Sequence, residues 1–137
     1  MTNNQAKTLW ESLWECSDVK GVKFAYAVLK NREKLTSYLT EVSENPIVVA
    51  YEKKRIELAE KLAKKDEEGK AVIIQGRYQF EDQKVYEEAV KEMPERKEYE
   101  EFMESEAEVE LHMIKQEDVS PEITANQLSG IEALIEK

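Results

Sequence analysis

The side chains best suited to covalent or acid–base chemistry are a single cysteine, Cys16, and a single histidine, His112. A cysteine thiolate beside an imidazole can attack a carbonyl carbon, but the two side chains must meet in one cleft. Here they lie far apart in the sequence, and no short signature of a cysteine nucleophile surrounds either residue. We therefore predict no catalytic residues and a protein that is not an enzyme.

A second group with ligand chemistry is the alternating row Glu106, Glu108, Glu110 and His112. On a β-strand these side chains share one face at a spacing of about 7 Å, which is too wide for neighbours to bind one small metal ion. Glycine occurs only at positions 21, 69, 76 and 130, so the chain has no glycine-rich phosphate loop. We expect a solvated strand face, no metal site and no cofactor.

The negative charge is concentrated in one part of the chain. The net charge of the 137 residues is −10, and residues 81–110 hold 13 Asp and Glu against 4 Lys and Arg, a balance of −9. Because nucleic-acid affinity comes largely from basic side chains, we expect no direct nucleic-acid binding. The acidic run could instead imitate a nucleic acid toward a basic protein, with Glu98, Glu100, Glu101 and Glu104 as candidate contacts.

The first half of the chain has the apolar periodicity of helices. Residues 1–16 form an amphipathic pattern that carries Trp10 and Trp14, which either dock this helix on the core or anchor a partner protein. Residues 19–66 form a long helical segment, with Asn45 and Pro46 placed either to start a new helix or to kink one continuous helix.

The second half mixes β and helical patterns. We expect a β-hairpin at 70–80, an acidic helical segment at 82–104, a strand at 106–114 and a C-terminal helix at 121–137. Gln75 and Gly76 occupy the hairpin connection, where the turn type stays open. Gln75, Arg77 and Tyr78 are candidate contacts at its tip.

These elements together predict a single domain at residues 1–137 of the α+β class that is mostly helical. In it, a long antiparallel helical hairpin is joined by the β-hairpin, and the 106–114 strand completes a small three-stranded antiparallel sheet. Short helices lie at both termini. No apolar run is long enough to span a membrane, and the first residues lack a basic region followed by an apolar core, so we expect no membrane contact and a cytoplasmic protein.

The order of several segments resembles a family of small uncharacterised proteins of tailed bacteriophages with long non-contractile tails and of their prophages. The resemblance spans Val28 to Glu136 and rests on these stretches: VLKNREKL, YEKKRIELAEKLAKKDEEGK, GRYQFED, EVELHMIK and ITANQLSGIEALIE. It implies a phage origin and a shared fold, and it carries over no site residues.

The functional expectation is a non-enzymatic bacteriophage protein that acts through protein–protein contacts in the host cytoplasm, as an assembly subunit or an accessory factor. Its partner would be a phage or host protein, and we also expect a homo-oligomer formed through the helices. The alternative is an acidic inhibitor of a host protein that handles nucleic acid or defends against phage.

Overall fold

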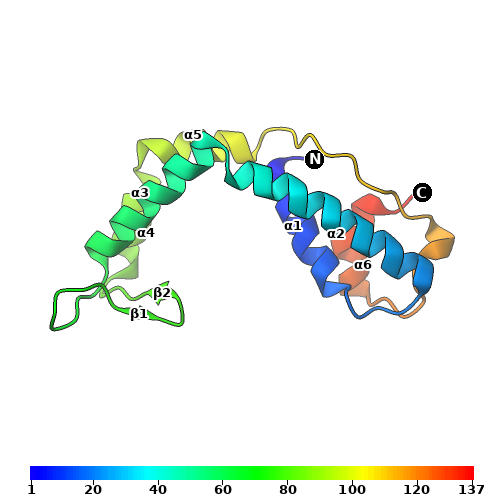
Figure 1. The fold of residues 1–137 in the computed structure, drawn as a ribbon, viewed down its shortest axis with the longest axis horizontal. Helices are drawn as coiled ribbons and strands as arrows, with labels where there is room; N and C mark the ends of the chain where they lie inside the picture. Colours follow the sequence, from blue (N-terminus) through cyan, green and yellow to red (C-terminus); the bar gives the residue numbers. More distant parts are fainter. The chain divides into compact units, whose positions relative to one another are not determined.

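The computed structural model describes residues 1–137 and is mostly helical, with one two-stranded antiparallel sheet (Figure 1). The helices are α1 (Asn3–Glu15), α2 (Val22–Ser43), α3 (Pro46–Leu62), α4 (Gln83–Lys91), α5 (Pro94–Met103) and α6 (Ala125–Ile131), with 3₁₀ turns η1 (Gln116–Asp118) and η2 (Glu132–Leu134). The strands are β1 (Ile73–Ile74) and β2 (Arg77–Tyr78).

The chain forms two compact units, where the sequence analysis expects one domain. The first contains Met1–Ser43 and Met103–Lys137, and the second contains Glu44–Phe102. Each unit has an apolar cluster of its own, so we describe the two separately.

Local capping residues start most of the helices. The Thr2 and Gln5 side chains form a capping box at the start of α1, and Thr124 and Gln127 form another at α6. Asn45 accepts a hydrogen bond from the Ile47 N–H (2.9 Å) ahead of Pro46, so a new helix begins there. The two alternatives at this proline are thereby resolved in favour of a break.

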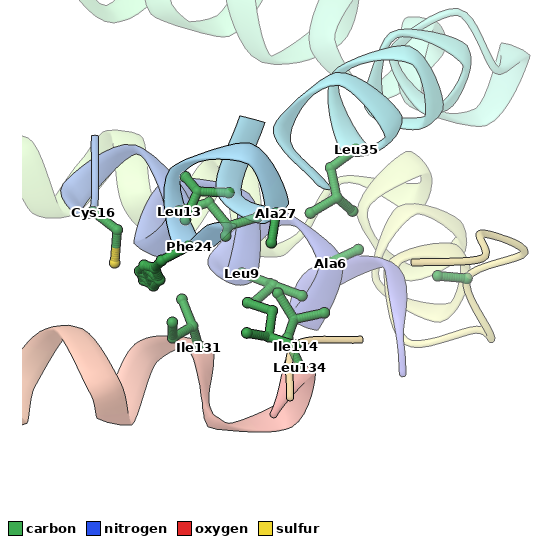
Figure 2. Close-up of a cluster of buried hydrophobic side chains, with 12 residues drawn as sticks. Ala6, Leu9, Leu13, Cys16, Phe24, Ala27, Leu35, Ile114, Ile131 and Leu134 are labelled. Carbon is green, nitrogen blue, oxygen red and sulfur yellow. The ribbon is translucent and has the colours of Figure 1, made fainter. Parts of the chain in front are cut away.

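The first unit packs α1 against α2 and α6. Figure 2 shows side chains from the three helices meeting in one cluster, among them Leu9 and Leu13 of α1, Phe24 of α2 and Ile131 of α6. The approach of α6 to α1 is close, because a Cβ atom added to Gly130 would lie 2.7 Å from Ser12 Oγ. Packing of this kind, rather than helix propensity, holds these short helices in place.

The C-terminal helix is shorter than the sequence analysis expects, since α6 ends at Ile131 and η2 follows. After η2, Glu136 N–H donates to the Ile114 carbonyl (2.8 Å), and Ile114 N–H donates to the Leu134 carbonyl (2.7 Å). The last residues are therefore extended, because their backbone bonds go to another segment.

The second unit is a pair of antiparallel helical segments connected through the β-hairpin. Near the start of α3, the Tyr51 ring stacks on Tyr99 of α5 with centroids 4.0 Å apart. Further along α3, Arg55 Nη1 donates to the hydroxyl of Tyr86 in α4 (3.3 Å). This order of contacts is that of an antiparallel pair, and Pro94 separates α4 from α5.

Helix α3 ends at Leu62, earlier than the expected boundary at residue 66. The next residues pair with the hairpin instead, since Lys64 N–H donates to the Gln79 carbonyl (2.7 Å) and Val72 N–H donates to the Lys64 carbonyl (2.8 Å). Gly69 has a φ of +80° and lies in a turn, where its N–H donates to the Asp66 carbonyl. Ladder bonds to the hairpin therefore replace the last turn of the helix.

The hairpin itself pairs Ile73 with Tyr78 and Ile74 with Arg77. Its two central residues, Gln75 and Gly76, both have positive φ (53° and 75°), which is the conformation of a type I′ turn. A type I′ turn has the backbone twist that matches two flanking antiparallel strands.

The expected third strand is not confirmed. The sheet has two strands, and residues 106–114 belong to the first unit while the hairpin belongs to the second. This segment makes only isolated bridges, Thr2 with Glu106 and Ile114 with Ile135. Its alternating pattern is real, but helix side chains bind its backbone in place of neighbouring strands.

Candidate functional site

The two tryptophans of α1 have different environments, although they lie one helical turn apart. Trp10 is half-buried, and its Nε1–H donates to Thr36 Oγ1 on α2 (2.9 Å). Trp14 is 48% exposed and meets Trp10 edge to face, with ring centroids 6.1 Å apart at 74°. Trp10 therefore docks α1 on α2, and Trp14 is the aromatic side chain that is free to contact another molecule.

Trp14 is held in one orientation by Arg32 of α2. The guanidinium carbon lies 3.7 Å from the Trp14 ring centroid, and Arg32 Nη1 donates to Ser17 Oγ (2.9 Å). The Ser17 hydroxyl in turn donates to the Trp14 carbonyl (2.6 Å). The Nε of Arg32 is buried and has no hydrogen-bond acceptor. This closed set of contacts fixes an indole and a guanidinium side by side at the surface.

A hollow of about 370 Å³ adjoins this pair, lined by Trp14, Leu29, Arg32, Glu33, Thr36 and Ser37. Leu29 continues an exposed apolar stripe along α2 with Tyr26 and Val22, at helical spacings of three and four residues. Val22 is 88% exposed. We name the surface made by Trp14, Val22, Tyr26, Leu29 and Arg32 the α1–α2 face.

Most of this face was missed by sequence reasoning, which named Trp14 as a candidate contact but none of Val22, Tyr26, Leu29 and Arg32. The buried stripe of α2 consists of other residues: Phe24, Ala27, Val28, Asn31, Leu35 and Val42. A signal was present, because apolar residues on α2 cover more of the helix circumference than one packed stripe requires. Arg32 had no distinguishing signal, because its partner Trp14 comes from another helix.

The hairpin contact candidates belong to the second unit. Gln75 and Arg77 are exposed, while Tyr78 is half-buried and its hydroxyl donates to Glu60 Oε1 (3.2 Å). Ile73 and Ile74 are both more than half exposed. The tip thus presents apolar and basic side chains on a short hairpin with little packing of its own.

The four candidate glutamates are all exposed. Glu100 accepts a hydrogen bond from Arg96 Nε (2.7 Å), and Glu104 accepts one from Asn4 Nδ2 (2.6 Å). Glu98 and Glu101, three residues apart on α5, have no such partner in the chain. Two of the four glutamates therefore accept hydrogen bonds within the chain, and the free acidic surface is smaller than the number of acidic residues indicates.

The two residues suited to covalent chemistry, Cys16 and His112, have different surroundings. Cys16 is buried, and burial, followed by the charge of Glu15, raises the pKa of its thiol above the ordinary value. A raised pKa leaves less thiolate at neutral pH, so this cysteine is a core side chain of the first unit. His112 is exposed on the 106–114 segment, and no three Asp, Glu, His or Cys side chains gather as a metal site would require.

Comparisons with protein-family models, curated proteins and solved structures found no match to this chain. None of its helices combines the length and the apolar composition that crossing a membrane requires. The contact residues named from the sequence therefore stay predictions.

Proposed function

We propose that this chain is a non-enzymatic protein that binds another protein through the α1–α2 face. The observation that carries the proposal is Trp14, an exposed indole held in place by Arg32 beside a hollow that Leu29 also lines. Tryptophan, tyrosine and arginine are the side chains that most often dominate binding energy at interfaces. Because the contacts of Trp14 are already made in the free protein, little side-chain entropy is lost when a partner covers it.

The resemblance to small phage proteins supports a phage origin for this chain. On that basis the chain is an assembly subunit or an accessory factor of a tailed bacteriophage, acts in the host cytoplasm and meets a phage or host protein. Direct contact with nucleic acid plays no part in it.

The test is affinity purification from infected host cells, followed by titration of the recovered partner with purified variants. We expect Trp14→Ala to weaken binding by about 2 kcal/mol or more, roughly 30-fold in Kd. Arg32→Lys keeps the charge but loses the planar stack on the indole, so it should also weaken binding.

Val49→Ala is the matched control, because Val49 is similarly exposed but lies on α3 in the second unit. Its Kd should equal that of the unmodified protein. A partner that binds all of these variants equally would contradict the use of the α1–α2 face.

The second candidate function is an acidic inhibitor of a basic host protein. It is supported by Glu98 and Glu101, whose exposed carboxylates have no partner within the chain, in the part of the sequence with the highest negative charge. Changing Glu98, Glu100, Glu101 and Glu104 to lysine should then abolish binding, and rising salt should weaken it steeply. Binding that is insensitive to salt would exclude this candidate.

A further inference from the structure

Residues 106–114 run as an extended segment along the first unit, the yellow-to-orange trace of Figure 1. Their side chains alternate as on a half-buried strand. Ala107 is buried, and Val109 and Leu111 pack on the core from the same side of the segment. The intervening residues Glu108, Glu110 and His112 are exposed. The segment thus has the side-chain pattern of a β-strand without a ladder partner.

Backbone hydrogen bonds along the middle of this segment involve only even-numbered residues. Glu108 N–H donates to the Tyr38 hydroxyl (3.2 Å), and Asn31 bonds both backbone groups of His112 (2.6 and 2.8 Å). Tyr38 and Asn31 both belong to α2, so helix side chains occupy this edge. In an extended chain successive backbone groups point to opposite edges.

The other edge therefore carries the N–H and C=O groups of Val109, Leu111 and Met113, and none of these bonds to another part of the chain. Exposed edges of this kind are templates for pairing with a further extended chain. On this second edge the Ala107 N–H donates to the Met1 carbonyl (2.8 Å), and the edge is open only from Val109 to Met113, as on an edge strand that is partly covered.

We propose that this open edge pairs in an antiparallel manner with the same segment of a second copy of the chain. A two-fold axis at Leu111 places Leu111 opposite its own copy and Val109 opposite Met113 of the second copy. The free N–H and C=O groups of all three residues then point toward the second strand. Met113, which is 43% exposed in the single chain, then packs beside Val109 of the second copy.

The exposed side chains select this register. With the axis at Leu111, each Glu110 lies opposite a His112, whose ring N–H can donate to the carboxylate. Moving the axis to Glu110 places two glutamates opposite each other, and moving it to Val109 places Glu108 opposite Glu110. Moving it to His112 loses the Glu–His pairs. The segment is therefore most complementary to itself in one antiparallel register.

This inference is independent of the proposed function, because it uses the backbone edge at 109–113 and not the α1–α2 face. The interface involves one short strand from each copy, so it belongs to the weak and transient class. Sedimentation equilibrium from about 10 µM to 1 mM covers the range of such affinities. We expect a monomer–dimer equilibrium for the unmodified chain and for Trp14→Ala alike.

Two exposed residues give variants that should leave the fold intact. His112→Glu places like charges opposite each other twice in each dimer, so we expect its dimer Kd to rise about tenfold. Glu110→Lys combined with His112→Glu restores opposite charges and should return the Kd close to its original value. Glu117→Lys changes an exposed acid outside the segment and serves as the control.

Amide hydrogen exchange gives a readout that needs no variant. As the protein concentration rises, the amides of Val109, Leu111 and Met113 should gain protection, whereas the amide of Glu110, on the other edge, should not. A chain that stays monomeric up to about 1 mM would overturn the proposal. Equal dimerisation of His112→Glu, a double variant that fails to recover, or protection that does not alternate would overturn the pairing.

Discussion

At the scale of single residues, the most informative side chain is Asn31. It is fully buried on α2, and its amide binds both the N–H and the C=O of His112, as a neighbouring strand would. Tyr38, two turns further along α2, donates to Asn3 Oδ1 (2.5 Å) and accepts from Glu108 N–H. These two polar side chains fix which edge of the 106–114 segment faces the helix.

Replacing Asn31 with alanine should lower the free energy of unfolding of the first unit by about 2–3 kcal/mol. Both hydrogen bonds disappear, and the backbone N–H and C=O of His112 lose their partner beside the core. Urea unfolding followed by circular dichroism measures the change.

Asn126→Ala is the control for this substitution, because Asn126 is exposed on α6. It should change stability by less than about 0.5 kcal/mol. If Asn31→Ala were equally mild, Asn31 would not be what holds the segment.

At the scale of elements, the contact between α3 and α5 depends on two stacked tyrosines. The rings of Tyr51 and Tyr99 lie nearly parallel, at 10°, and burial raises the pKa of both phenols above the ordinary value. The folded unit therefore favours the neutral phenols, and an unfolded chain ionises them at a lower pH.

This difference predicts that the second unit loses stability at high pH. The stabilisation is complete below the ordinary tyrosine pKa of about 10 and declines as pH rises through the raised pKa of the folded state. Thermal unfolding measured at several pH values, together with the absorbance of phenolate, should show the loss.

The double variant Tyr51→Phe with Tyr99→Phe keeps two stacked rings and removes both ionisable groups. Its stability should depend less on pH in the same range. An unchanged pH dependence would mean that other groups cause the alkaline loss.

At the scale of the whole molecule, each of the two units has an apolar cluster of its own. The first contains Leu13, Phe24 and Ile131 among others, and the second is built on Tyr51, Val90 and Met93. No buried residue of one cluster belongs to the other. A single domain would unfold as one cooperative unit, whereas two separate cores allow two transitions.

We expect Leu13→Ala to destabilise the first unit by about 2–5 kcal/mol, because it leaves a cavity at a fully buried position. Amides in α3 and α4 should keep their hydrogen-exchange protection. Val90→Ala should have the reverse effect. If either substitution lowered protection in both units equally, the chain would be one cooperative domain, as the sequence analysis expects.

The sequence by itself determined the features that depend on neighbouring residues. Asn45 starts a new helix at Pro46, which is one of the two alternatives that the sequence analysis gives, and the capping boxes at Thr2 and Thr124 and the turn at Gln75 and Gly76 likewise form between residues close together in the chain. Each involves bonds or dihedral angles within a few residues, so local chemistry is enough to specify it.

Only the tertiary structure decided which long-range partner each segment takes. The 106–114 pattern indicated a strand, but the side chains of Asn31 and Tyr38, more than 60 positions earlier, bond the middle of its backbone. Trp10 and Trp14 share one helix face in the sequence, yet only Trp10 finds an acceptor, Thr36. Alternation and periodicity state which side of an element is apolar, and they leave open what covers it, because that depends on how distant segments pack.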